Sequence, residues 1–255
     1  MSSLLCLFDP EDPILPLDLR WTDLPRTALR PRHRLAGPTT TLPVDPLRLA
    51  HATLRADIGR DLPLCTLRSR AIGFLLLYGS SLGAHARNLR VALQEYADFV
   101  RTSLAARIGQ GLALLHLEDQ DYAYIAAYQH VVKSSGRSRG SRRPDFVLGH
   151  RTSHQTALLE AKASTARNIQ PGDVRRKLTD ALAQLEEGLR SLPGRIHEAY
   201  ATLTVLRDMD AKVDSEAYVT HIKGTAKVPA TEDDLVLRNN YGRWLLFMGL
   251  GNLGR

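Results

Sequence analysis

The sequence predicts an α/β protein in which a central mixed sheet is flanked by helices, and three patterns support this prediction. Residues 171–192 place leucines and a valine on one side of a helix that begins at Pro171. Two apolar runs, 145–149 and 156–164, are joined by a polar turn and predict adjacent strands. Residues 200–208 and 216–224 predict further strands. Helices before and after a run of strands indicate a single α/β or α+β core, of which the α/β class is the one predicted here.

The remaining elements are expected as follows. From Gly83 to Ile108 apolar residues recur at three- and four-residue steps and predict a helix. Its stripe consists of Leu89, Leu93, Tyr96, Val100 and Leu104. The glycines in 109–111 predict a break, 112–120 a short helix and 122–132 a strand rich in β-branched and aromatic residues. A last helix is expected at 239–254.

The N-terminal part differs in composition from the rest of the chain. Residues 1–60 are rich in proline, leucine and arginine and show weak periodicity, which predicts an extended segment that packs on or precedes the core. Residues 61–255 are expected to form the main domain. A chain of 255 residues is long enough for one large domain with such an extension.

Composition excludes several classes of protein. Cys6 and Cys65 lie far apart without Cys or His companions, so neither a disulfide framework nor a structural zinc site is expected. The longest apolar run, 71–79, is too short to span a membrane, and no signal peptide is visible. No phosphate-binding loop, dinucleotide fingerprint or G-x-S-x-G elbow is present. We expect a soluble cytoplasmic protein that does not associate with membranes.

The charge of the chain indicates a polyanionic partner. The formal net charge is +7, and the segment 133–143 places cationic side chains among glycines and serines. These cations are Lys133, Arg137, Arg139, Arg142 and Arg143. The segment, called the basic loop below, is either a solvated connector or a flexible contact to a phosphate backbone.

Acidic residues interrupt both of the apolar runs that predict adjacent strands. Strand alternation places Leu158, Glu160 and Lys162 on one face and Leu159, Ala161 and Ala163 on the other. Glu160 and Lys162 are either neighbours on the wet face of an edge strand or part of a site. If the two strands form a hairpin, Asp145 and Glu160 converge at one end of the sheet. Two converging carboxylates repel each other unless a divalent cation such as Mg²⁺ or Mn²⁺ neutralises them.

Pro144-Asp145, a turn, Glu160-Ala161-Lys162 at the end of an apolar strand and a following amphipathic helix together resemble the PD-(D/E)XK nuclease superfamily. The resemblance covers about residues 83–222 and implies a restriction-endonuclease-like core, which consists in order of a helix, three mainly antiparallel strands, a crossing helix and a further strand. It implies that Asp145, Glu160 and the carbonyl of Ala161 bind Mg²⁺ or Mn²⁺. It also implies that Lys162 lies beside the attacking water.

Two glutamines complete the set of catalytic residues that the resemblance implies. Many members carry a glutamate on the first helix, and Gln110 stands where it is expected. This departure leaves three alternatives open: a single-metal site, an acid moved to Glu95 or Glu118, or weakened activity. Gln184 matches a glutamine that some members use in the helix after the lysine, although a solvent-facing glutamine fits the pattern equally well.

The resemblance implies a Mg²⁺-dependent nuclease that acts on DNA or, as a less favoured substrate, RNA, alone or as a homodimer or with another protein partner. The arginine-, alanine- and leucine-rich residue usage suggests a bacterial source. A role in defence against foreign DNA is then expected by family analogy only. Two alternatives remain open: a catalytically inactive nucleic-acid-binding protein on the same fold, and an exported nuclease toxin.

Overall fold

The structure of the chain, a computed structural model, describes residues 15–24, 39–58, 70, 72–74, 82–85, 88–92, 96–134, 143–165, 169–208, 211–223 and 236. Within them a mixed seven-stranded sheet has the order β2-β1-β9-β8-β7-β6-β5. Its strands are β1 (Leu15–Leu24), β2 (Thr39–Val44), β5 (Tyr122–Ala127), β6 (Phe146–His150), β7 (Thr156–Ser164), β8 (Glu198–Val205) and β9 (Glu216–Lys223). A separate hairpin pairs β3 (Leu82–His85) with β4 (Asn88–Val91).

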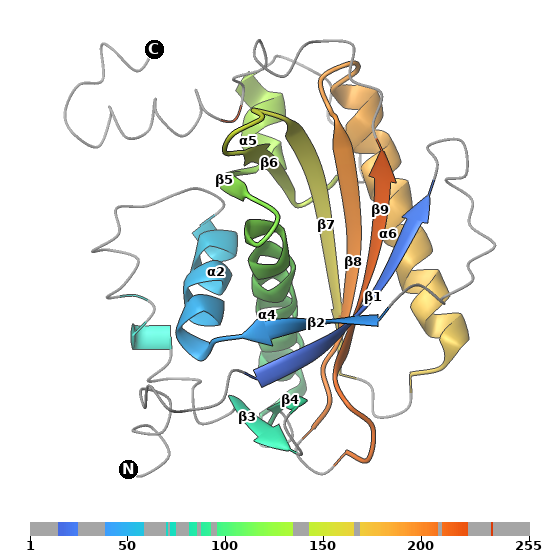
Figure 1. The fold of residues 1–255 in the computed structure, drawn as a ribbon. Helices are drawn as coiled ribbons and strands as arrows, with labels where there is room; N and C mark the ends of the chain where they lie inside the picture. Colours follow the sequence, from blue (N-terminus) through green and yellow to red (C-terminus); the bar gives the residue numbers. More distant parts are fainter. Residues whose placement is uncertain are drawn as a thin grey trace.

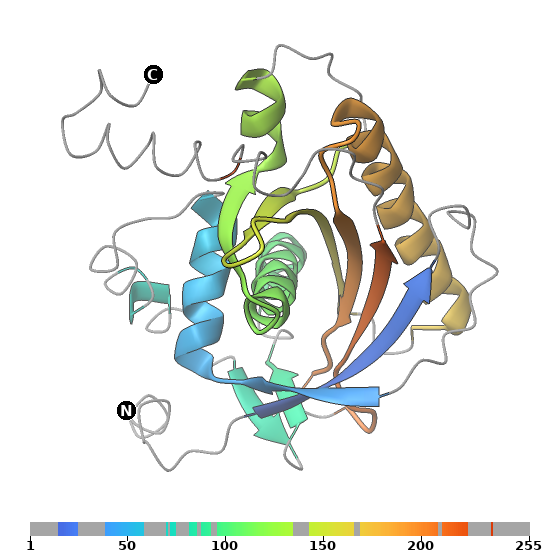
Figure 2. The ribbon, with the colours of Figure 1, turned by 45° about the horizontal axis from the view of Figure 1, so that its top comes forward.

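The sheet curls around one long helix. Helix α4 (Asp98–Glu118) lies inside the curl, and α2 (Pro46–Ile58) covers its other side (Figure 2). Helix α6 (Pro171–Ser191) packs on the outer face of the sheet, along β7 and β8 (Figure 1). The short helix α5 (Tyr128–Ser134) follows β5. The α/β prediction with a mixed sheet between helices is therefore confirmed.

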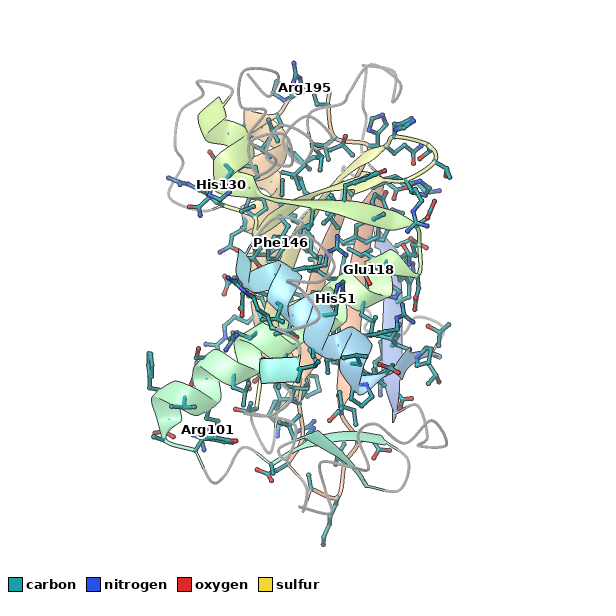
Figure 3. All side chains as sticks on the ribbon, turned by 90° about the vertical axis from the view of Figure 1, so that its left-hand side faces the viewer. His51, Arg101, Glu118, His130, Phe146 and Arg195 are labelled. Atoms are coloured by element: carbon teal, nitrogen blue, oxygen red, sulfur yellow. The ribbon has the colours of Figure 1, made fainter. Side chains whose placement is uncertain are left out.

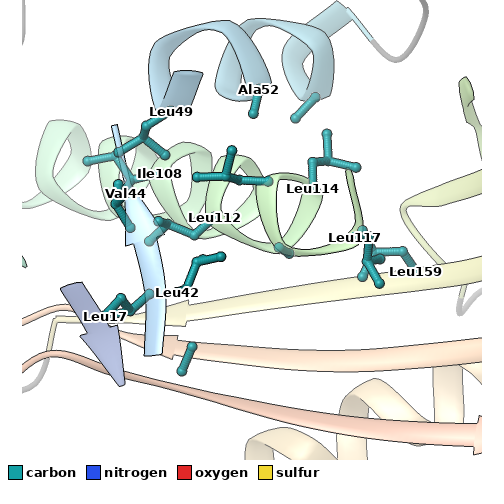
Figure 4. Close-up of a cluster of buried hydrophobic side chains, with 14 of the residues drawn as sticks. Leu17, Leu42, Val44, Leu49, Ala52, Ile108, Leu112, Leu114, Leu117 and Leu159 are labelled. Atoms are coloured by element: carbon teal, nitrogen blue, oxygen red, sulfur yellow. The ribbon is translucent and has the colours of Figure 1, made fainter. Parts of the chain in front are cut away.

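Two hydrophobic clusters hold these layers together. The inner cluster joins α2, α4 and the concave face of the sheet, with Leu49 and Ala52 above Leu112, and Leu159 from β7 on the far side (Figure 4). The outer cluster packs Leu158 against Leu182 and Leu185 of α6. Neighbouring residues of β7 thus face opposite layers, as strand alternation predicts.

The N-terminal residues that the structure describes belong to this same folded unit. Strand β1 pairs in parallel with β9, and β2 forms the edge of the sheet beside β1. The expected extended segment also contains a helix, α2, which its weak periodicity does not indicate. Figure 3 faces α2 and shows it in front of α4; Arg55 of α2 forms an ion pair with Glu118 of α4.

Three predicted elements need correction. The helix predicted from Gly83 begins only at Asp98, because Leu89 and Val91 are both buried two residues apart in a strand. The predicted break at 109–111 is absent, and α4 runs through it. The predicted strand 122–132 ends at Ala127, and Tyr128, Val131 and Val132 are buried at helical spacing in α5.

The other predicted elements are confirmed, except one that falls outside the described residues. The hairpin of β6 and β7 and the helix beginning at Pro171 are present with the expected partners and buried stripe. Strands β8 and β9 match the predicted segments closely. The helix predicted at 239–254 lies outside the described residues.

Candidate metal centre

Asp145 lies where β6 and β7 stop pairing. The last paired residues of the hairpin are Phe146 and Leu159, and the Asp145 N–H still donates to the Leu159 carbonyl, 3.1 Å away. The next N–H on that side of β7, from Ala161, donates to Asp145 Oδ2 at 3.0 Å. The side chain of Asp145 thus replaces a backbone partner at the end of β6.

The carbonyl of Ala161 faces the same region. In a strand, the N–H and C=O of one residue point to the same side, so the Ala161 carbonyl points toward β6, as its N–H does. The pairing of β6 with β7 ends at Phe146 and Leu159, and no backbone bond from β6 reaches Ala161. This oxygen is therefore placed to act as a ligand beside Asp145.

Glu160 is the most deeply buried acid of this region, with a residue exposure of 1%. Its Oε1 lies 2.5 Å from Lys162 Nζ, whereas its Oε2 is buried without a hydrogen-bond partner in the described part of the chain. Burial, reinforced by the charge of Asp145, raises the pKa of Glu160 to about 8, although Lys162 opposes the shift. A buried carboxylate oxygen without a partner is costly unless the group takes up a proton or a cation binds it.

Asp145 experiences the same environment. Burial raises the pKa of Asp145, while the Ala161 N–H, the charge of Lys162 and a hydrogen bond from the Gln110 side chain act in the opposite direction. The hairpin therefore brings Asp145 and Glu160 together as the sequence predicts.

Close helix packing brings Gln110 to this position. A Cβ on the preceding residue, Gly109, would lie 2.7 Å from the Cβ of Ala163 on β7. Only glycine permits so short an approach between α4 and the sheet. On the other face, a Cβ on Gly188 of α6 would lie 2.5 Å from Pro144. The two glycines thus let both helices pack tightly around the site.

Lys162 lies between the acid and α6. Its side chain is 30% exposed, and its Nζ donates to Gln184 Oε1 at 3.0 Å in addition to the contact with Glu160. Gln184 therefore faces the site rather than solvent. Of the two acids considered in place of Gln110, Glu118 is ion-paired with Arg55, and Glu95 lies outside the described residues.

The basic loop is described only at its ends. Lys133 belongs to α5, Arg143 is half-buried immediately before Pro144, and Arg137, Arg139 and Arg142 lie outside the described residues. The position of Arg143 places the end of the loop next to Asp145. The phosphate contacts of this loop stay a prediction.

The donors at this site fit a hard divalent cation. They are carboxylate oxygens of Asp145 and Glu160 and the carbonyl oxygen of Ala161, the oxygen ligands that Mg²⁺ and Mn²⁺ prefer. Among the described residues no group of three or more His, Cys, Asp or Glu side chains is arranged to hold a metal. The site thus offers two acids and a carbonyl.

A second polar cluster occupies another part of the sheet, and the sequence does not predict it. Glu198 Oε2 accepts hydrogen bonds from the hydroxyls of Tyr122, at 2.6 Å, and Tyr200, and His221 Nε2 lies 3.7 Å away. His221 also contacts Asp23 Oδ1 at 2.9 Å through Nδ1. The residues of this cluster come from β1, β5, β8 and β9, so no local sequence pattern could reveal the cluster.

Comparisons with protein-family models, with curated proteins and with solved structures find no match to this chain. No helix in the described ranges is long and apolar enough to cross a membrane.

Proposed function

We propose that this protein is a Mg²⁺-dependent nuclease that hydrolyses phosphodiester bonds in the cytoplasm, in DNA rather than RNA. The observation that carries the proposal is the buried, unpartnered Oε2 of Glu160 next to Asp145 and Lys162 in the described part of the chain. The order of α4, three antiparallel strands β5 to β7, α6 and β8 supports it, since the PD-(D/E)XK resemblance implies this order.

Each residue has a distinct role in the proposed reaction. Asp145, Glu160 and the Ala161 carbonyl would hold the cation, which would lower the pKa of a bound water and stabilise charge on the phosphate. Lys162 Nζ would orient the attacking water and offset negative charge as the phosphate is attacked. Gln184 holds Lys162 in place through its Oε1.

Cleavage assays on single variants test this proposal. Asp145→Asn and Lys162→Ala should each lower Mg²⁺-dependent cleavage of plasmid DNA by at least about a hundredfold. The controls Asp98→Asn, at the far end of α4 from Gln110, and Lys212→Ala change exposed residues outside the site and should cleave as the wild type does. Unchanged cleavage by either site variant would remove that residue from the chemistry.

A binding protein without catalysis is the second candidate, and Gln110 favours it because an amide stands where the resemblance implies a third acid. In that case the protein would bind nucleic acid without Mg²⁺-dependent cleavage. A role in defence against foreign DNA is proposed by analogy alone.

A further inference from the structure

One flank of helix α6 borders the candidate metal centre. Gln184 lies on this flank, because its Oε1 accepts a hydrogen bond from Lys162 Nζ at 3.0 Å. Gly188, one turn further along α6, lies against the residue that leads into β6, since a Cβ on Gly188 would be 2.5 Å from the side chain of Pro144. The flank that carries Gln184 therefore faces the β6 side of β7.

Lys177 lies on the same flank, nearer the N-terminus of α6. It precedes Gln184 by seven residues, about two turns of helix, so the two side chains leave α6 in nearly the same direction. Leu178, next to Lys177, packs in one cluster with Leu203, the partner of Lys162 on β8. The pairing of β6 with β7 does not extend to this part of β7. Lys177 thus borders the side of β7 that β6 leaves unpaired, where the proposed metal ligands lie.

The charge of Lys177 is not neutralised by the residues around it. Lys177 is half-buried and forms no ion pair within the described part of the chain. Of the acids one turn away, Asp173 pairs with Arg176, and Asp180 is exposed. Three consecutive cations, 175–177, also lie close to the N-terminus of α6, where the positive end of the helix dipole disfavours them. In a chain of net charge +7, this arrangement fits a polyanionic partner.

Lys177 and the end of the basic loop lie on opposite sides of the site along α6. Arg143 immediately precedes Pro144, which lies against Gly188. From Gly188 to Lys177 the helix rises about 17 Å, and from Gln184 to Lys177 about 10 Å. Since a nucleic-acid strand advances about 3.4 Å per nucleotide, these lengths correspond to about five and about three nucleotides. A strand that runs along α6 from one cation to the other therefore passes the proposed metal ligands.

We infer that Lys177 contacts a phosphate of the bound DNA strand about three nucleotides from the scissile phosphate, on the side of the site opposite the basic loop. The inference rests on the proposed function and specifies how the same site holds its substrate. A contact of this kind positions the strand and adds affinity, but it does not read the bases.

DNA affinity over a salt series tests this contact. Fluorescence anisotropy of a labelled duplex is measured without divalent cations, so that the DNA stays intact. Lys177→Ala should weaken binding about three- to tenfold and reduce the slope of log K against log salt by about one, whereas Lys177→Arg should retain the slope. Arg175→Ala removes the same charge on the opposite side of α6 and should leave the slope unchanged. Alanine is a good helix former, so both alanine variants should fold.

Neutral phosphates locate the contact along the strand. A single methylphosphonate about three nucleotides from the cleaved bond should weaken binding of the wild type but not of Lys177→Ala. Equal changes of the salt slope in Lys177→Ala and Arg175→Ala would overturn the inference. A methylphosphonate effect that Lys177→Ala does not abolish would do the same.

The outcomes also separate this inference from the nuclease proposal. If the wild type cleaves plasmid DNA with Mg²⁺ but Lys177→Ala binds DNA as the wild type does, the contact is wrong and the nuclease proposal stands. If only Lys177→Ala reduces the slope but the wild type does not cleave, the contact stands and the nuclease proposal is wrong. No DNA binding by the wild type would overturn both.

Discussion

Glu160 and Glu198 lie in neighbouring strands of one sheet, yet their environments act on them in opposite directions. Glu160 has one lysine contact, a nearby acid and an oxygen without a partner among the described residues, and its pKa rises to about 8. Glu198 is surrounded by His221 and two tyrosine hydroxyls, which hold its pKa at about 2. The protein thus stabilises the ionised form of Glu198 and disfavours the ionised form of Glu160.

This difference in environment indicates a structural role for Glu198 and a functional role for Glu160. Glu198 joins β5, β8 and β9 through side chains, so its charge contributes to the stability of the fold. The charge of Glu160 contributes little to the stability of the fold, because its environment disfavours the ionised form that a metal ligand needs. Acids retained at a cost to stability are typical of functional sites.

Replacing each glutamate by glutamine should therefore change stability in opposite directions. At pH 8 without metal, Glu160→Gln should raise the free energy of unfolding by about 1 kcal/mol, because it removes a disfavoured buried charge. Lys162 is partly exposed and keeps its hydrogen bond to Gln184, so its own charge does not lose every partner. Glu198→Gln should lower it by about 2–3 kcal/mol, because two hydroxyls lose a charged acceptor. Urea denaturation measures both.

The response to Mg²⁺ provides the control. The wild type and Glu198→Gln should gain about 2.7 kcal/mol of stability at a Mg²⁺ concentration a hundredfold above Kd, whereas Glu160→Gln should gain little. Equal destabilisation by both substitutions without metal would show that Glu160 is a structural acid like Glu198.

The sequence predicts the site around Glu160 but not the cluster around Glu198. Asp145, Glu160 and Lys162 lie on one hairpin, so strand alternation and a short turn suffice to bring them together. Glu198, Tyr122 and His221 meet through the curl of the sheet, which depends on contacts between distant segments. The sequence also predicts a helix break where Gly109 instead permits close packing, because a glycine that ends a helix and one that packs against a strand look alike in a sequence.

The glycine that brings α4 to β7 should be sensitive to a single methyl group. Gly109→Ala places a Cβ 2.7 Å from Ala163 Cβ and should destabilise the protein by about 1–3 kcal/mol and weaken Mg²⁺ binding. Gly172→Ala in α6 meets nothing within 4 Å and should be neutral or slightly stabilising. Thermal unfolding compares the two, and equal effects would show that the contact at Gly109 is not tight.

The smallest expected effect is a pH dependence confined to the Glu198 cluster. Burial lowers the pKa of His221, but Glu198 and Asp23 outweigh burial and leave it raised above 6.5. A raised pKa means that the folded state holds the proton more tightly, so this stabilisation is fully present below pH 6.5 and is lost as the pH rises through the folded-state pKa.

His221→Gln should remove this contribution. The loss of stability that the substitution causes should be larger below pH 6.5 than at pH 9, by about 0.5–1 kcal/mol. The effect is small because Asp23 is largely exposed and its pair with His221 is partly screened by solvent. Chemical denaturation at both pH values measures the difference, in which other titrating groups such as His116 cancel. If the stability difference between the wild type and His221→Gln is the same at both pH values, His221 is neutral in the folded protein. Glu198 would then be stabilised by the tyrosine hydroxyls rather than by a neighbouring charge.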